Sequence, residues 1–370
     1  MNKRRILLIG CGKAGNKLVN DMVKKDRRLT GLFVNTAYDD MADLEMFKED
    51  NAFLFSSADG SGRNRLKAQE YVKEQINSLV DVIAAYPLHD VIYIFTSADG
   101  GTGSGMTPMF CKLLKMTFDR MKLNKKINLV AVMPSIKNDD KVGFENALSF
   151  WNELTEDKKG NDTSIKDTCI NNLFVIDNSK GDSYKDINER AVNSLVNSFN
   201  MNGHHDEGDI DDSDAKIFNT ESGYGIVLEL DKHIKDAKIA VDNSIRSSVF
   251  AMPDSYDCNY IGISLCEDDY LISDVRECFD TVYKAQYQTY NNKSNTVVLS
   301  GCYDPNELIE NIKNKLDEIN ERYNNRDRVE KKVKIDIKNT THKKIKKEEK
   351  AEFTEKDIED ISSALEDLFG

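Results

Sequence analysis

The stretch that decides the fold reads Ser97-Ala98-Asp99-Gly100-Gly101-Thr102-Gly103-Ser104-Gly105. It follows the apolar run 91–95, which predicts a buried strand, and precedes residues 106–118, whose apolar positions recur at helical spacing. The glycines leave backbone N–H groups free to converge on an anion, and the helix start adds free donors and a favourable dipole. Thr102 and Ser104 offer hydroxyl groups to phosphate oxygens. The stretch therefore predicts a phosphate-binding loop, in preference to a flexible surface turn.

Two further glycine-rich stretches follow predicted strands and precede predicted helices. Residues 10–16 read Gly-Cys-Gly-Lys-Ala-Gly-Asn, a G-x-G-x-x-G pattern in which Asn16 stands where a Walker loop has its lysine. Residues 57–65 form a third such loop and carry Arg63 and Arg65. Because loops that follow parallel strands share one edge of an α/β sheet, the three can surround one ligand. The basic third loop favours a polyphosphate, and Asn16 argues against a P-loop NTPase.

Composition limits the function classes. The chain has 370 residues, is 31% charged and 39% hydrophobic, and carries a net charge of −13, which argues against a general nucleic-acid binder. Its seven cysteines form no C-x-x-C pair, which predicts reduced thiols, and its five histidines show no metal-ligand spacing. No apolar run approaches the ~20 residues of a membrane span. We therefore expect two packed domains in a soluble, cytoplasmic protein without a protein-bound metal.

The remaining sequence alternates strand and helix patterns. Strands are predicted at 5–10, 31–34, 52–55, 91–95, 127–133, 172–176, 224–230, 259–265 and 295–301, and helices at 17–25, 66–86, 106–118, 144–154, 183–201, 232–252, 270–283 and 304–328. Asn35 follows the second strand, where a dinucleotide-binding enzyme would place an acid on the ribose. This weakens the alternative of an NAD-dependent oxidoreductase. The second half has no glycine-rich phosphate loop and predicts a smaller α/β domain.

The long helix in the middle of the chain carries Tyr184 and Asn188 on one face at its N-terminal end. The tyrosine ring can stack on a purine while the carboxamide bonds its edge, and a capping turn with an incidental tyrosine is the alternative. The segment 204–214 that follows is strongly acidic. It is either a solvated loop or a device that aims Asp211 and Asp214, three residues apart at a helix start, at a reacting group.

The C-terminal segment differs in character from the rest. Residues 326–350 are rich in lysine and arginine and predict a disordered basic linker. A capping-box pattern at 354–357 then precedes apolar residues that share one helical face up to Phe369. Such an amphipathic helix is predicted to dock on a partner. Direct DNA contact by the linker, a contact with an adjacent subunit and a solvated tail are the alternatives.

Taken together, the motifs resemble the tubulin/FtsZ superfamily over roughly residues 1–325, with Asp99 in place of the family's leading glycine. The resemblance is carried by Gly10-Cys11-Gly12 with Asn16, Asn35-Thr36, Gly60-Ser61-Gly62-Arg63 and Gly100 to Gly105. Matches at 146–152 and 176–178 make it most similar to the TubZ group of plasmid and phage segregation tubulins. The resemblance implies an α/β fold. Its parts would be a parallel-sheet GTP-binding domain over 1–183, a central helix over 184–203, a second domain over 204–303, a helix over 304–330 and a tail over 331–370.

The resemblance also implies a site for GTP or GDP. Nucleotide contacts would come from Gly10, Cys11, Gly12, Asn35, Gly60, Ser61, Gly62, Arg63, Ala98, Asp99, Gly100, Gly101, Thr102, Gly103 and Ser104. Asn16, Tyr184 and Asn188 would address the guanine base, Tyr184 by stacking. An acid of the 139–145 loop, Glu145 or Asp139, would meet the ribose.

In this family the site is completed by the next subunit, which here would contribute Asp211 and Asp214. These acids would polarise a water, while the loops and a phosphate-bound Mg²⁺ would stabilise the transition state. FtsZ-type loops place an asparagine ahead of two aspartates, whereas Asp209 and Ile210 precede Asp211 here, which leaves the essential acid open. Such a head-to-tail contact does not close and builds filaments.

The function that the resemblance implies is a GTP-hydrolysing protein whose dynamic filaments segregate plasmid or phage DNA. Its partners would be other copies of itself and a DNA-bound adaptor that the tail recruits, with no membrane. A cell-division FtsZ and a phage-centring tubulin are the alternatives within the superfamily.

Overall fold

The computed structural model describes residues 1–55, 60–84, 86–156 and 161–330. Residues 1–321 form one compact unit and residues 322–370 a second. The predictions for the linker and terminal helix, and for positions 57–59 of the third loop, fall outside the described residues.

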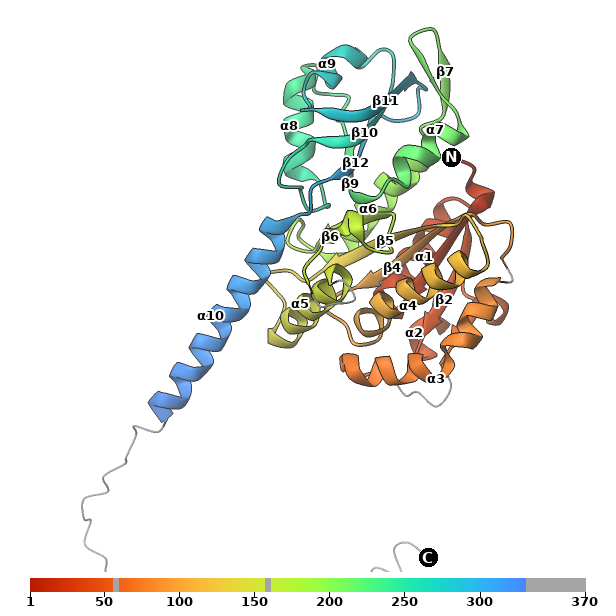
Figure 1. Ribbon diagram of the computed structural model, residues 1–370. Helices are drawn as coiled ribbons and strands as arrows, with labels where there is room; N and C mark the ends of the chain where they lie inside the picture. The colour runs from red at the N-terminus through yellow and green to blue at the C-terminus, as the bar shows by residue number, and fades with distance from the viewer. Residues whose placement is uncertain (56–59, 85, 157–160, 331–370) are drawn as a thin grey trace, which may run out of the picture. The chain divides into compact units, whose positions relative to one another are not determined.

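One mixed sheet of ten strands organises the first unit, in the order β11-β10-β12-β9-β6-β5-β4-β1-β2-β3 (Figure 1). Its N-terminal part consists of parallel strands: β1 (Ile6–Cys11), β2 (Thr30–Asn35), β3 (Ala52–Leu54), β4 (Val91–Ser97), β5 (Lys126–Met133) and β6 (Asn172–Asp177). Strand β1 is buried along its whole length, because helices cover a parallel sheet on both faces. The predicted α/β fold with a parallel-sheet domain is confirmed.

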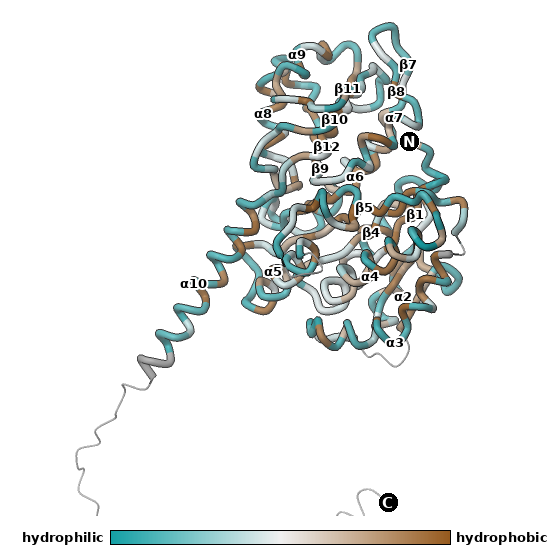
Figure 2. Tube along the Cα trace, viewed as in Figure 1, coloured by the Kyte–Doolittle hydropathy of each residue, from teal (hydrophilic) through white to brown (hydrophobic). Residues whose placement is uncertain are grey.

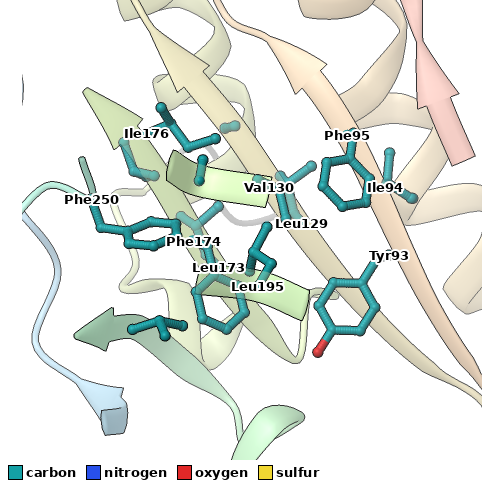
Figure 3. Close-up of a cluster of buried hydrophobic side chains, with 14 of the residues drawn as sticks. Tyr93, Ile94, Phe95, Leu129, Val130, Leu173, Phe174, Ile176, Leu195 and Phe250 are labelled. Atoms are coloured by element: carbon teal, nitrogen blue, oxygen red, sulfur yellow. The ribbon is translucent and has the colours of Figure 1, made fainter. Parts of the chain in front are cut away.

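Helices connect these strands: α1 (Gly12–Lys25), α2 (Asp39–Ala42), α3 (Arg65–Ala84), α4 (Thr102–Arg120), α5 (Lys141–Thr155) and α6 (Tyr184–Phe199), with short 3₁₀ turns at Lys3–Arg5, Glu49–Asn51 and Ile165–Asp167. Figure 2 shows the hydrophobic colour gathered in the strands and on the inner sides of the helices. In Figure 3, Tyr93 and Phe95 of β4, Phe174 of β6 and Leu195 of α6 gather in one buried cluster. The central helix α6 is thereby packed against the sheet whose strand ends carry the loops.

The sheet continues into the second half through a short pairing of β6 with β9, at Asn172↔Gly223 and Leu173↔Tyr224. The second half contains β7 (Gly203–His205), β8 (Gly208–Ile210), α7 (Asp212–Asn219), β9 (Gly223–Glu229), α8 (Ala237–Ser247), β10 (Cys258–Leu265), α9 (Ile272–Arg276), β11 (Val282–Tyr290), β12 (Thr296–Cys302) and α10 (Asn306–Glu330). Strand β12 runs antiparallel to both β9 and β10, whereas β11 is parallel to β10. None of the helices in the described ranges combines the length and apolar character that crossing a bilayer requires.

Two sequence predictions for the second half were wrong. The helix expected over 270–283 is only the five residues of α9, and β11 was missed although its sequence mixes aromatic and β-branched residues typical of strands. The helix expected over 232–252 is confined to α8, which Asp236 caps. The acidic segment 204–214 contains the β7–β8 hairpin and the start of α7.

Candidate functional site

The carboxyl ends of five parallel strands meet at one pocket of about 480 Å³. Fourteen predicted nucleotide residues line it: Cys11, Gly12, Asn35, Gly60, Ser61, Gly62, Arg63, Asp99, Gly100, Gly101, Thr102, Gly103, Tyr184 and Asn188. The other lining residues are Lys13, Ala14, Lys17, Thr36, Asp40, Ser97, Val132, Asp139 and Asn178. The fold therefore brings the three glycine-rich loops together at one edge of the sheet, as ligands of open α/β sheets require.

The glycine-rich stretches are largely helix starts instead of free loops. Helix α1 begins at Gly12 and not at the predicted residue 17, and α4 begins at Thr102 and not at 106. Gly12 has φ +73°, and a Cβ there would lie 3.0 Å from the backbone nitrogen of Gly103. The N-terminal turns of both helices, whose N–H groups have no intrahelical partner, thus meet at the pocket.

Gly101 lets two loops make close contact. A Cβ at Gly101 would lie 2.7 Å from the backbone carbonyl carbon of Arg63 and would also collide with the Ser61 hydroxyl. Thr102 Oγ1 lies 3.1 Å from Ser61 Oγ and 2.7 Å from Thr36 Oγ1, so one hydroxyl group connects three strand ends. These hydroxyl contacts join the segments that follow β2, β3 and β4 into one continuous wall of the pocket.

Three predicted residues support this wall from behind and do not line the pocket. The Ser104 hydroxyl donates to the Gly100 carbonyl within α4, so its predicted role as a phosphate donor is corrected. Ala98 is fully buried and its N–H donates to the Val132 carbonyl at 2.8 Å, while Gly10 lies inside β1. All three residues therefore make contacts within the protein and do not line the pocket.

Arg63 is held by two carboxylates at the rim. Its guanidinium donates to Asp140 at 2.8 Å and lies 3.9 Å from Asp99. Asn146 donates its side-chain amide to the backbone carbonyls of Arg63, Asp99 and Gly100 at 3.0 to 3.2 Å, which joins the third loop to the central loop. Arg65 turns away and pairs with Glu153, so only one of the two predicted basic residues serves the pocket.

At the other end of the pocket, the Tyr184 hydroxyl lies 3.5 Å from both carboxylate oxygens of Asp139. Partial burial, followed by the charge of Asp139, raises the pKa of Tyr184. Partial burial also raises the pKa of Asp139 itself. Of the two acids offered for the ribose, only Asp139 lines the pocket. Glu145 is paired with Lys141 on α5 at 3.5 Å, so its prediction is corrected.

Asn16 does not line the pocket, so its predicted contact with the base is corrected. Its amide donates to the Val34 carbonyl at 3.2 Å and its oxygen accepts from the Val34 N–H at 3.3 Å. Both polar ends of this fully buried side chain therefore fasten α1 to β2. Lys17, one position further along the helix, lines the pocket instead.

Two buried polar atoms of the pocket wall lack a hydrogen-bond partner within the described residues: Asn35 Nδ2 and Asn178 Oδ1. Such orphaned atoms are rare in native proteins, and a polar ligand or an ordered water in the pocket would satisfy them. Asn35 was predicted as a site residue. Asn178 was missed, although it follows β6 as Asn35 ends β2, and that shared position was the available signal.

Asp211 and Asp214 form the cap of α7 and lie outside the pocket. Asp211 Oδ1 accepts from the N–H of Ser213 at 2.6 Å and of Asp214 at 2.9 Å, while Asp214 Oδ2 accepts from the Asp211 N–H at 3.1 Å. The other oxygen of each carboxylate is left out of this reciprocal cap. This reciprocal arrangement, a capping box, therefore fixes the position of Asp211 relative to Asp214.

Helix α7 lies at the amino ends of the strands whose carboxyl ends form the pocket. Asp212 pairs with the ammonium group of Met1, ahead of β1, at 3.2 Å, and Lys216 pairs with Asp90, directly ahead of β4, at 2.5 Å. Figure 1 accordingly marks the N-terminus beside α7. Since a strand rises ~3.3 Å per residue, β1 and β4 separate the acids from the pocket by roughly 20 Å. The two predicted halves of the site are thus not brought together within one chain.

The side chains of the described residues include no group of three or more His, Cys, Asp or Glu that could hold a metal ion. Asp40, Asp99 and Asp139 line the pocket without forming such a group. The side chains of the described residues therefore do not provide a metal cage of their own.

The chain is similar to several known proteins. It is 26% identical over 303 residues to the tubulin-like protein TubZ of Clostridium botulinum C phage, which covers 81% of this chain and 79% of that protein. The structure of tail-truncated TubZ from Clostridium botulinum phage c-st aligns with a TM-score of 0.77 and 23% identity, over 87% of this chain and 100% of that one. A GTPγS-form protofilament of TubZ from Bacillus thuringiensis serovar israelensis aligns with a TM-score of 0.68 and 17% identity, over 87% and 94%.

These structural likenesses show the tubulin/FtsZ-like fold. Residues 5–180, which carry the three glycine-rich loops, match the family described as the Tubulin/FtsZ family, GTPase domain. The resemblance to the tubulin/FtsZ family that was read from those loops is therefore confirmed over residues 5–180.

Proposed function

We propose that this protein binds and hydrolyses GTP and assembles head-to-tail into filaments in which each site is shared by two subunits. The observation that carries the proposal is the position of the Asp211–Asp214 cap. It lies at the opposite sheet edge from the pocket of its own chain. In a head-to-tail row, the α7 end of one subunit faces the pocket of the next, so the row supplies what one chain lacks.

The lining residues favour one orientation of the proposed nucleotide. The phosphates lie at the N-termini of α1 and α4, where unpaired backbone N–H groups and helix dipoles favour negative charge. The base lies at the opposite end, beside Tyr184 and Asn188, with Asp139 available to a ribose hydroxyl group. The orphaned amide atoms of Asn35 and Asn178 are satisfied by the ligand.

Hydrolysis requires a water in line with the terminal phosphate and charge stabilisation around it. The loops at α1 and α4 stabilise the phosphate oxygens, and Mg²⁺, when bound to the phosphates, adds positive charge. The carboxylate oxygens that the capping box leaves unused, on the neighbour's Asp211 and Asp214, accept hydrogen bonds from the water and polarise it. Product release then weakens the contact, because the terminal phosphate no longer bridges the two subunits.

Filament assembly is supported by the relatives, since the Bacillus thuringiensis TubZ was solved as a GTPγS-form protofilament. The proposed cellular role is segregation of plasmid or phage DNA in the cytoplasm, as the similarity to a phage TubZ suggests. A DNA-bound adaptor would be recruited by the C-terminal segment.

The shared site predicts that GTP turnover per molecule rises with protein concentration. At concentrations below assembly, where contacts between two subunits are limiting, doubling the protein should raise the total rate roughly fourfold by mass action. Phosphate release measured over a dilution series tests this directly. A turnover number that stays constant on dilution would mean that the site is complete within one chain.

Deletion of residues 331–370 should leave GTP hydrolysis unchanged and abolish adaptor recruitment. The physical reason is that the pocket and the α7 acids both lie within residues 1–321. Phosphate release and co-sedimentation with the adaptor–DNA complex measure the two activities separately. If the truncated chain no longer forms filaments, the segment is a subunit contact instead of a cargo contact.

A further inference from the structure

Lys13 is the one charged residue of the first glycine-rich stretch, and it lines the pocket. It is the second residue of α1, its side chain is 62% exposed, and its ammonium lies 2.8 Å from the carboxylate of Asp40. Asp40 belongs to the short helix α2 and lines the same pocket. The two side chains form an ion pair at the pocket rim, here called the Lys13–Asp40 pair.

The position of this pair relates it to the phosphates. Gly12, which precedes Lys13, is in close contact with Gly103 at the start of α4. The two helix N-termini meet there, and this is where the proposed nucleotide places its phosphates. Tyr184 and Asn188, at the base end, come from α6 instead. The Lys13 ammonium is therefore within reach of a phosphate chain without any backbone movement, since a lysine side chain has four flexible carbons.

The balance of charges in the pocket makes the ammonium group of Lys13 important for binding an anion. Among the described residues, three basic and three acidic side chains line it, so they contribute no net charge: Lys13, Lys17, Arg63, Asp40, Asp99 and Asp139. Arg63 is held by two carboxylates, whereas Lys13 is bonded to one, at an exposed position. Exposed ion pairs contribute little stability, so the ammonium can exchange Asp40 for a ligand anion at small cost.

We propose that Lys13 is a specificity-determining residue that exchanges its Asp40 partner for a phosphate of the bound nucleotide. It thereby makes the pocket sensitive to the number of phosphates. Asp40 competes with the ligand phosphate for the same ammonium group and thereby lowers the affinity of the pocket for the nucleotide. This inference rests on the proposed function, because it assumes a nucleoside polyphosphate in this pocket.

The test is calorimetric titration of the full chain with GTP, GDP and guanosine, below the concentration of assembly. Lys13→Ala should weaken GTP binding by about tenfold, since hydrogen bonds to charged groups are the strong ones. GDP should lose less and guanosine nothing, while Lys13→Arg should stay near wild type. Lys24→Ala is the matched control, because Lys24 lies on the same helix in a similar exposed pair with Glu45 and outside the pocket.

Asp40→Asn should change the affinity in the opposite direction and tighten GTP binding by a few-fold, since it frees the ammonium. The double variant Lys13→Ala/Asp40→Asn distinguishes competition from simple repulsion. If Asp40 acts through Lys13, the double variant binds GTP as weakly as Lys13→Ala alone. Tightening by Asp40→Asn in both backgrounds would overturn the exchange.

The outcomes separate this inference from the proposed function. A wild-type chain that binds none of the three ligands removes the proposed GTP site itself. A wild type that binds GTP while Lys13→Ala matches Lys24→Ala removes only the role of Lys13. Equal losses for guanosine and GTP in Lys13→Ala would indicate a structural role, and thermal unfolding of each variant checks that the fold is intact.

Discussion

Asp214→Asn will lower GTP turnover by roughly 10²- to 10⁴-fold, the usual contribution of a positioned acid–base group. GTP binding and filament formation should persist, since Asp214 lies outside the pocket of its own chain. Asparagine keeps an oxygen that can accept from the Asp211 N–H, so the capping box survives while the charge is lost. The expected product is a static filament that retains GTP.

Phosphate release and light scattering, measured on the same sample, separate turnover from assembly. Asp206→Asn is the matched control, because it removes one exposed charge from the same acidic segment without touching the cap of α7. Asp211→Asn, measured alongside, assigns the essential acid. Normal turnover in both cap variants would exclude the Asp211–Asp214 cap from catalysis.

Gly101→Ala should weaken GTP binding. The new Cβ would meet the Arg63 backbone at 2.7 Å, so the third and central loops must separate. Overpacking of this kind costs about 1–3 kcal/mol, which corresponds to roughly 5- to 150-fold in affinity if the strain falls on the bound state. Filament formation, which depends on the nucleotide, should weaken with it.

Gly100→Ala is the comparison variant: Gly100 also lines the pocket, but among the protein atoms a Cβ there would approach only the Ser97 hydroxyl, at 3.9 Å. Titration with GTP and thermal unfolding of the two variants compare the same added methyl group one residue apart. The interpretation fails if both variants bind GTP equally well, because the loop contact at Gly101 would then be dispensable.

A mixture of the Asp214→Asn and Gly101→Ala variants also tests whether the site is shared between two subunits. Asp214→Asn keeps its pocket and Gly101→Ala keeps its acids, so each chain retains the half that the other has lost. Mixing them should recover part of the turnover that neither shows alone, because an intact pocket then meets an intact cap across the contact. Recovery would exclude a site contained within one chain.

The predicted residues line the pocket where the prediction depended on backbone conformation. Glycines that follow a strand and precede a helix are needed wherever backbones approach closely, as at Gly12 and Gly101, and that need is visible in the local pattern. Tyr184 and Asn188 were predicted together because helical geometry alone puts residues four apart on one face. Fourteen of the nineteen predicted nucleotide residues line one pocket, and these local rules account for that agreement.

The predicted residues that do not line the pocket differ from the others in side-chain direction. Asn16 and Lys17 are neighbours in sequence, yet one is buried against β2 and the other lines the pocket. Asp139 and Glu145 were both considered for the ribose, but Glu145 lies within α5 and pairs with Lys141 one turn earlier on the same helix. Ser104 became a support within α4 because the helix starts two residues before it. Each outcome depends on which face of a helix meets the sheet.

By itself, the sequence determined the order of strands, glycine-rich turns and helices in the first half of the chain, because those depend on backbone freedom and hydrophobic period over a few residues. The tertiary structure decided which atoms of these segments face the pocket, and it paired Lys13 with Asp40 from another helix. It also placed the pocket and the Asp211–Asp214 cap at opposite ends of the same strands. That separation is a long-range property of how the chain crosses the sheet, and no local pattern contains it.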